Sequence, residues 1–218
     1  MIKLVIFDLD GTLLDTLSDL TAAVNASLSA YGFPPRTREE VQQFVGNGVS
    51  KLLERALPAV AHPFSDPAQL RARFETYYDA HLWDATTVYP GMDELLSALQ
   101  ARGVQMAVAS NKYQSATERL IEHFFPSVRF AAVCGQQDRR PRKPHPQIVE
   151  DILKETAVTP QETLCVGDSA VDMQTARNAG VRACGVTWGF RLREELKKEE
   201  PAWIVDTPQQ ILEIAEKA

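Results

Sequence analysis

Two aspartates follow the first apolar run of the sequence and could do chemistry together. The run from Leu4 to Leu9 contains Asp8 and is followed by Asp10, Gly11 and Thr12. Two carboxylates at the end of a buried strand are costly unless a cation neutralises them, and hard oxygen ligands favour Mg²⁺. A glycine there permits a tight turn in which backbone N–H groups approach an anion. We therefore predict a site for a metal and an anion; a strand-end turn with a capping aspartate is the alternative.

A second acidic pair follows a later apolar run. Asp168 comes directly after the run Leu164 to Gly167, and Asp172 lies four residues further on. If a helix begins near Ser169, the two carboxylates face the same way. The alternative is an N-cap aspartate beside a solvated helical one. Together with the first pair, the pattern favours a shared metal site.

Two further segments offer groups that could hold a phosphate. Ser110-Asn111-Lys112 follows an apolar run, where a hydroxyl, an amide and the N–H groups of a helix N-terminus could bind phosphate oxygens. Serine or asparagine is also an ordinary helix cap at this point. In Lys143-Pro144-His145-Pro146, the lysine could balance the charge of carboxylates and phosphate, or belong to a plain basic loop. We interpret His145 as structural.

The elements that must position these residues read as an α/β fold. Short apolar runs that are typical of buried parallel strands alternate with amphipathic stretches. The expected strands are Leu4 to Leu9, Val104 to Ser110, Phe130 to Cys134, Leu164 to Gly167, Ala183 to Val186 and Ile204-Val205. We predict a Rossmann-like parallel sheet with helices on both faces. Ligands bind beyond the carboxyl ends of the strands in such sheets, which is where the four polar segments fall.

One stretch interrupts the alternation. Residues 15–86 show helix signals and no convincing strand, with helices expected at Thr16 to Tyr31, Arg38 to Val45, Val49 to Leu57 and Pro67 to Trp83. This is far too long for an ordinary connection. We predict an inserted helical domain at 15–86, a core formed by 1–14 and 87–218, and a hinge at the two crossings.

Composition limits the function classes. The 218 residues carry a net charge of −6, which argues against nucleic acid as the main partner but permits a small anionic substrate. Three cysteines without a CxxC pair favour buried thiols in a reducing compartment over disulfides. The sequence shows neither a signal peptide nor a membrane span, so we expect a cytoplasmic protein.

In order and in position at strand ends, the four polar segments resemble the signature motifs of the haloacid dehalogenase superfamily. The matching segments are DLDGTLLDT, SNK, KPHP and GDSAVD, and the resemblance covers essentially the whole chain. The helical insertion resembles the small α-helical cap of that family. Within it, the chain looks most like the phosphoglycolate phosphatase branch. The cues are Phe44-Val45-Gly46-Asn47-Gly48, SNK, Trp188-Gly189-Phe190 and Asp206-Thr207-Pro208-Gln209, which several sugar-phosphate phosphatases and a pyrophosphatase share.

The resemblance implies a magnesium-dependent phosphatase. Asp8 would attack phosphorus to give an aspartyl-phosphate, and Asp10 would act as general acid and then general base. Mg²⁺ would be bound by Asp8, the backbone carbonyl of Asp10 and Asp168, with Asp172 completing or orienting that set.

The resemblance also implies a phosphate and substrate set. Ser110 and Lys143 would hold the transferring phosphoryl group, and Gly11, Thr12 and Asn111 belong to the same expected phosphate site. Gly46, Asn47 and Gly48 would contact the organic part of the substrate while the cap closes as a lid.

Several readings stay open beside this one. The substrate would be a small phosphorylated metabolite such as 2-phosphoglycolate, acted on by a monomer or a homodimer. The alternatives are a hexose-phosphate phosphomutase, a pyrophosphatase and a non-catalytic phospholigand-binding module. Asp10 argues against a dehalogenase, because halide needs no protonation. Lys51, the only lysine of the insertion, would be needed for phosphonate hydrolysis, although its surroundings indicate a solvated helix face. The basic stretch Arg139 to Arg142 is either a surface patch or a device that steers an anionic substrate.

Overall fold

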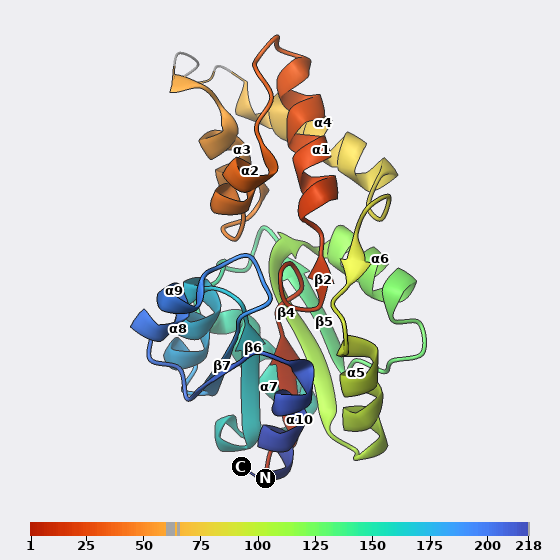
Figure 1. The fold of residues 1–218 in the computed structure, drawn as a ribbon, viewed down its shortest axis with the longest axis vertical. Coiled ribbons are helices and arrows are strands. Elements are labelled where there is room, and N and C mark those ends of the chain that lie inside the picture. Colours follow the sequence, from red (N-terminus) through yellow and green to blue (C-terminus); the bar gives the residue numbers. More distant parts are fainter. Residues whose placement is uncertain (60–63, 65, 218) are drawn as a thin grey trace. The chain divides into compact units, whose positions relative to one another are not determined.

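The chain forms two compact units. The computed structural model describes residues 1–59, 64 and 66–217. One unit comprises Met1–Asp15 and Val88–Ala218, and the other comprises Thr16–Thr87. The first is an α/β unit and the second is helical (Figure 1).

The α/β unit is built on a six-stranded sheet in the order β5-β4-β1-β6-β7-β8. All neighbouring strands are parallel, and β1 lies between β4 and β6 near the middle. The strands are β1 (Leu4–Phe7), β4 (Gln105–Tyr113), β5 (Ala132–Gln136), β6 (Thr163–Gly167), β7 (Arg182–Val186) and β8 (Trp203–Val205). The predicted parallel α/β architecture is therefore confirmed.

Helices cover both faces of this sheet. They are α5 (Met92–Ala101), α6 (Gln114–Phe124), α7 (Gln147–Thr156), α8 (Ala170–Asn178), α9 (Arg193–Lys198) and α10 (Pro208–Lys217), with a short 3-10 helix at Pro160–Glu162. The apolar side chains of α7, α8 and α9 share one buried cluster with alternate residues of the strands, such as Leu4 and Ile6 of β1. The α5 and α10 helices contact each other on the opposite face (Figure 1). Burial on both faces explains why β1 is an unbroken apolar run.

The end of β4 differs from the sequence-based expectation. We predicted a strand that stops at Ser110 and a helix that follows at once, but the strand continues to Tyr113 and α6 begins at Gln114. Its register against β5 shifts between Ala109 and Tyr113. Ser110 and Asn111 therefore lie on an irregular strand end and not at a helix N-terminus. Two further short strands, β2 (Leu14–Asp15) and β3 (Thr87–Val88), were not predicted and form a separate two-stranded sheet.

The helical unit contains α1 (Leu17–Ser29), α2 (Arg38–Phe44), α3 (Val49–Ala56) and α4 (Pro67–Ala80). The starts of two helices follow directly from the sequence: Thr37 and Glu40 form a capping box on α2, and Asp66 caps α4 before Pro67. A buried carboxylate joins the first helix of the unit to its last residues. Asp19 of α1 accepts hydrogen bonds from the backbone of Ala85 and Thr86 at 2.8–3.1 Å and from the Thr86 hydroxyl at 2.7 Å.

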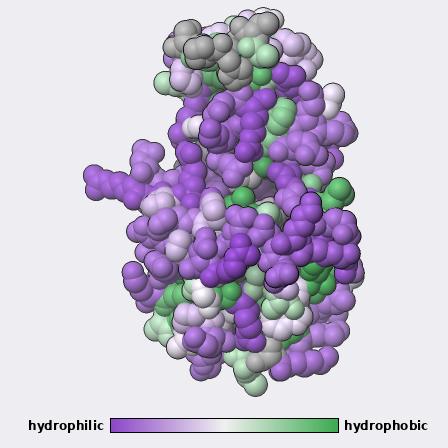
Figure 2. All heavy atoms as spheres, turned by 90° about the vertical axis from the view of Figure 1, so that its left-hand side faces the viewer, coloured by the Kyte–Doolittle hydropathy of each residue, from purple (hydrophilic) through white to green (hydrophobic). Residues whose placement is uncertain are grey.

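The surface is mostly polar, as one face in Figure 2 shows. Among the described residues, the large hydrophobic side chains that are exposed are Met1, Trp83 and Leu192. Cys165 and Cys184 are buried and, like Cys134, free of disulfides. The described residues include no helix that is both long enough and apolar enough to cross a bilayer.

Candidate active site

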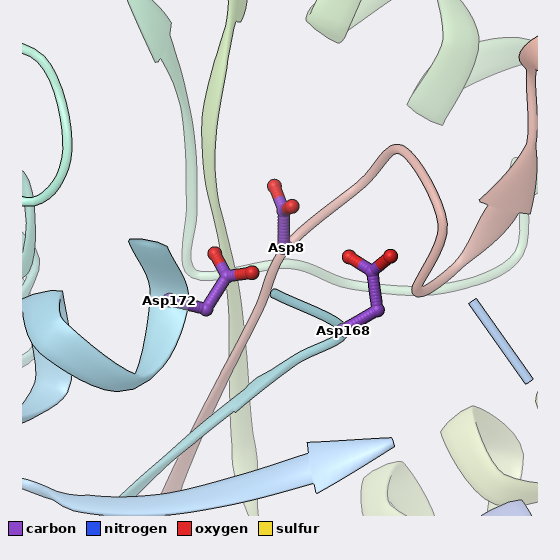
Figure 3. A group of neighbouring side chains, drawn as sticks. All are labelled: Asp8, Asp168 and Asp172. Carbon is purple, nitrogen blue, oxygen red and sulfur yellow. The ribbon is translucent and has the colours of Figure 1, made fainter. Parts of the chain in front are cut away.

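Three carboxylates meet at the carboxyl ends of the central strands. Asp8 directly follows β1, Asp168 directly follows β6, and Asp172 lies in the first turn of α8 (Figure 3). One oxygen from each lies within 4.8 Å of the others. The Asp8 N–H still donates to Val166 O of β6 at 2.9 Å, so the sheet itself fixes where this aspartate stands. The two acidic pairs of the sequence thus contribute three members to one cluster, while the Asp10 side chain is not part of it.

The turn after Asp8 is held by its own backbone. Leu9 O accepts N–H groups from Thr12, Leu13 and Leu14 at 3.0–3.2 Å, and Gly11 N–H donates to Leu14 O at 2.9 Å. The N–H groups of Gly11 and Thr12, which we expected to face an anion, are therefore used inside the turn. In this structure these N–H groups shape the turn, while the buried Thr12 Oγ1 has no hydrogen-bond partner among the described residues. The assignment of Gly11 and Thr12 to a phosphate site stays a prediction.

Gly11 is also required by space. Its φ is +84°, and a Cβ at this position would lie 2.5 Å from Asp168 Oδ2. A side chain would therefore both strain the backbone and collide with the acidic cluster.

Lys143 supplies a buried positive charge to the cluster. Its Nζ lies 2.7 Å from Asp172 Oδ1 and 3.0 Å from Asp8 Oδ1, and it donates to Ala109 O at 2.8 Å. The side chain is only 4% exposed. The lysine from the KPHP segment is thus fixed between two of the three carboxylates.

Asn111 has a different contact from the one we predicted. Its amide group donates to Lys143 O at 3.1 Å and accepts the Lys143 N–H at 2.9 Å. Both ends of this amide are therefore engaged by the backbone of Lys143. Asn111 thus holds the lysine loop against β4, and its expected contact with phosphate stays a prediction.

Lys112 is a site residue that sequence reasoning missed. Its buried Nζ lies 3.2 Å from Asp10 Oδ1, so the carboxylate that is absent from the acidic cluster has an ammonium of its own. The Lys112 N–H also donates to Ser110 Oγ at 3.2 Å. The position of Lys112 in SNK was the available signal, but its direction depends on the irregular end of β4.

Asp172 caps the N-terminus of α8 as well as contacting Lys143. Its Oδ2 accepts hydrogen bonds from Ser169 N at 3.1 Å and from Ser169 Oγ at 2.6 Å, and the first of these belongs to a capping box. With Lys143 on Oδ1, both of its oxygens are engaged. Asp172 is thus held rigidly by its own helix, and it holds Lys143 in turn.

Comparison with known proteins places this arrangement in a family. Residues 5–186 match the family model of the haloacid dehalogenase-like hydrolases. The chain belongs to this family. It is 35% identical to "Phosphoglycolate phosphatase 1" of Pseudomonas aeruginosa, over 99% of this chain and 80% of that protein. It is 34% identical to a phosphoglycolate phosphatase of Vibrio vulnificus, over 98% of this chain and 96% of that protein.

Solved structures agree with the family. A crystal structure described as a predicted phosphoglycolate phosphatase from Haemophilus somnus superimposes with a TM-score of 0.91 at 30% identity, covering 98% of this chain and 97% of that one. A Lactobacillus delbrueckii protein gives a TM-score of 0.89 at 32% identity, with 98% of both chains covered. The predicted family and the predicted hydrolase class are therefore confirmed.

The electrostatics of this hydrolase site indicate a need for more positive charge. Burial raises the pKa of Asp8 to about 7; the Lys143 ammonium opposes this rise, and the carboxylates of Asp172 and Asp10 add to it. Burial, together with Asp172 and Asp8, also raises the pKa of Asp168 well above its ordinary value. Burial alone would lower the pKa of Lys143, but Asp172 and Asp8 outweigh it and hold the pKa above the usual value.

The donor set fits a divalent cation. Oδ1 of Asp8 is buried and, apart from its ion contact with Lys143, has no hydrogen-bond partner among the described residues. The cluster contains three carboxylates, and the Lys143 ammonium contacts two of them, so a further cation of charge two balances the cluster. Oxygen ligands of this kind suit a hard cation.

The residues expected to contact the organic part of a substrate lie in the helical unit. Gly46, Asn47 and Gly48 form the loop between α2 and α3, where Gly46 and Gly48 have φ angles of +117° and +81°. Arg55 of α3 donates to Phe44 O and to Asn47 Oδ1, each at 2.8 Å. Arg55 is a second residue that sequence reasoning missed, and it fixes the shape of this loop.

Two basic features of the sequence have structural partners. Arg140 donates to Gly135 O and lies 3.7 Å from Asp151. Lys51 is 52% exposed and pairs with Glu54 at 2.7 Å, as expected for a solvated helix face. Neither contact involves the acidic cluster.

Proposed function

We propose that this protein is a Mg²⁺-dependent phosphatase that hydrolyses a small phosphate monoester through an aspartyl-phosphate on Asp8. The observation that carries the proposal is the position of Asp8, whose carboxylate stands 3.0 Å from the Lys143 ammonium and within 4.8 Å of two further carboxylates. A nucleophilic carboxylate in such surroundings can approach a phosphate dianion only when its own charge is balanced.

Asp8, Asp168 and the backbone carbonyl of Asp10 would hold the ion. When bound, Mg²⁺ withdraws charge from the phosphoryl oxygens and offsets the carboxylates. Asp172 has both oxygens engaged with Lys143 and Ser169, so we assign it the orientation of Lys143 and only a secondary part in binding the ion.

The reaction then runs in two balanced steps. Asp8 attacks phosphorus, the bond from phosphorus to the ester oxygen breaks, and Asp10 gives its proton to the leaving alkoxide. In the second step Asp10 takes a proton from water, the water oxygen attacks the same phosphorus, and inorganic phosphate leaves Asp8 free again. The need for Asp10 in both steps separates this reaction from dehalogenation.

Ser110 and Lys143 would hold the transferring phosphoryl group. The Ser110 Oγ accepts the N–H of Lys112, so its own hydrogen is available to a phosphoryl oxygen. The Lys143 ammonium is already fixed beside Asp8 and needs no rearrangement to stabilise charge on the phosphoryl group.

The best candidate substrate is 2-phosphoglycolate. Support comes from the relatives in Pseudomonas and Vibrio, which carry the name phosphoglycolate phosphatase and align over nearly all of this chain. In this proposal Gly46, Asn47 and Gly48 contact the organic part of the substrate, and the helical unit acts as a cap that closes over it. We propose a monomer or homodimer that works in the cytoplasm, in keeping with three free cysteines.

A panel of phosphorylated metabolites tests the proposal. We expect release of inorganic phosphate, fastest from 2-phosphoglycolate, and loss of activity in EDTA that Mg²⁺ restores. Isomerised sugar phosphate would indicate a phosphomutase, and preference for pyrophosphate would indicate a pyrophosphatase. Binding without turnover would indicate a phospholigand-binding module, and activity that persists in EDTA would remove the metal from the mechanism.

A further inference from the structure

The loop that follows β7 lies against the acidic cluster and has no part in the chemistry described so far. It contains Trp188, Gly189 and Phe190 and is anchored where it begins, because Thr187 N–H donates to Val205 O at 3.1 Å. The Thr187 hydroxyl also donates to Asp206 Oδ1 at 2.6 Å. The first residue of the loop is therefore bonded to the end of the neighbouring strand β8.

Gly189 makes the closest approach. A Cβ at this position would lie 2.2 Å from Asp168 Cβ and 2.3 Å from Gly11 O. Real Cβ atoms do not approach other heavy atoms so closely, so a side chain would displace Asp168, the turn at Gly11, or both. The absence of a side chain is what allows these three segments to meet.

The two neighbours of Gly189 add directed hydrogen bonds. The Phe190 N–H donates to Asp168 Oδ2 at 2.6 Å, and Phe190 itself is buried. The Trp188 Nε1–H donates to Thr12 O at 3.1 Å. One loop thus binds the aspartate after β6 and the turn after β1 at the same time.

We infer that Trp188, Gly189 and Phe190 form a positioning loop that fixes the orientation of Asp168 relative to the Asp8 turn. Because Phe190 N–H occupies Oδ2, the loop determines which oxygen of Asp168 is presented to a cation. The loop acts through Asp168 and the turn, with which its hydrogen bonds are made. This inference rests on the proposed function, since it assigns the loop to the same metal site.

The test measures Mg²⁺ affinity by calorimetric titration, together with kcat and KM. We expect Gly189→Ala to weaken Mg²⁺ binding by about 10-fold to 100-fold, as is typical when a residue behind a metal ligand is changed. Trp188→Phe removes one hydrogen bond and keeps the ring, so we expect a loss of roughly fivefold. The KM for the phosphate ester should change little in both, because the loop is inferred to act on the metal ligand Asp168 and on the turn.

Trp203→Phe is the matched control. Trp203 begins β8, where Arg182 lies over its ring, and it makes no contact with the acidic cluster. We expect its Mg²⁺ affinity and kcat to equal those of the wild type. Melting curves without metal show whether each variant is folded. If Gly189→Ala does not fold, the Mg²⁺ affinity of Trp188→Phe tests the inference.

Wild-type Mg²⁺ affinity in a folded Trp188→Phe variant would overturn the inference, as would an equal loss in Trp203→Phe. Failure of the proposed function looks different: the wild type would then bind Mg²⁺ but release no phosphate, and the order of Mg²⁺ affinities would still test the loop. A wild type that binds no Mg²⁺ would overturn both.

Discussion

Each of the two carboxylates to which we assign a part in the reaction has an ammonium beside it. Lys143 stands beside Asp8, and Lys112 stands beside Asp10 at 3.2 Å. In the proposed mechanism the second pair bears on proton transfer, because a fixed cation would stabilise the carboxylate that forms as Asp10 gives up its proton. We therefore predict that Lys112 acts through Asp10 and positions it.

We predict that Lys112→Met affects substrates according to their leaving groups. Turnover of an alkyl phosphate such as 2-phosphoglycolate should fall by about 10-fold to 100-fold, within the range that general acid catalysis contributes. Turnover of p-nitrophenyl phosphate should fall much less, because its leaving group departs without a proton. Lys154→Met, on the exposed surface of α7, is the control. Equal losses on both substrates would show that Lys112 does not act through Asp10.

The residues that the structure brings together were largely within reach of the sequence. Asp8 and Asp168 stand at the ends of apolar runs, and parallel strands place their carboxyl ends at one edge. Lys143 belongs to the KPHP segment in the loop after a third such run. The partners of Lys112 and Asn111 were not within reach, because the alternation of side chains fails where the register of β4 shifts. The backbone hydrogen bonds inside the Gly11 turn could not be predicted either, since they depend on the detailed path of the chain.

At the scale of elements, the loop between α2 and α3 is bonded to a side chain of α3. Arg55 bonds to Phe44 O and Asn47 Oδ1 and so ties both ends of the loop to α3. Two glycines with positive φ give the loop a shape that few other sequences adopt.

We predict that Arg55→Met raises KM for the phosphate ester by roughly threefold to tenfold and leaves kcat within about twofold, because an untied loop loses preorganisation but not chemistry. Lys51→Met is a matched change on the same helix, where only an exposed pair with Glu54 is lost. Steady-state kinetics of the two variants check this. An unchanged KM in Arg55→Met, or the same rise in both variants, would speak against a role for the loop in substrate binding.

Elements were easier to predict than their ends. Each expected strand of the sheet exists, but β4 extends three residues beyond Ser110 because Tyr113 pairs with Gln136 of β5 after the register shift. The two-residue strands β2 and β3 carry no periodicity that could be recognised. The four helices expected in the insertion are all present, and α2, α3 and α4 begin at the expected residues.

At the scale of the whole molecule, metal binding and stability are linked through Asp8. Its pKa of about 7 in the metal-free fold is well above the ordinary value of 3.8, so the folded chain binds more protons than the unfolded chain between these values. The contribution of this group to the free energy of unfolding is therefore fully present below about pH 3.8. It falls as the pH rises and is lost once the pH has passed about 7. Asp168 acts in the same direction.

We predict that Mg²⁺ raises the melting temperature by several degrees more at about pH 8 than at about pH 5.5, because the cation binds the deprotonated carboxylates that the metal-free fold tolerates poorly. Thermal melts at matched ionic strength, with and without Mg²⁺, measure this. A Mg²⁺ shift that is equal at both pH values, or larger at low pH, would contradict it.

The most direct test of the central proposal is the turnover of Asp8→Asn with saturating Mg²⁺. The amide keeps the shape of the side chain but is a far weaker nucleophile, so we predict a loss of kcat of at least about a thousandfold on 2-phosphoglycolate in a protein that still folds. Turnover by the folded variant at the wild-type rate would contradict the assignment of Asp8 as the nucleophile.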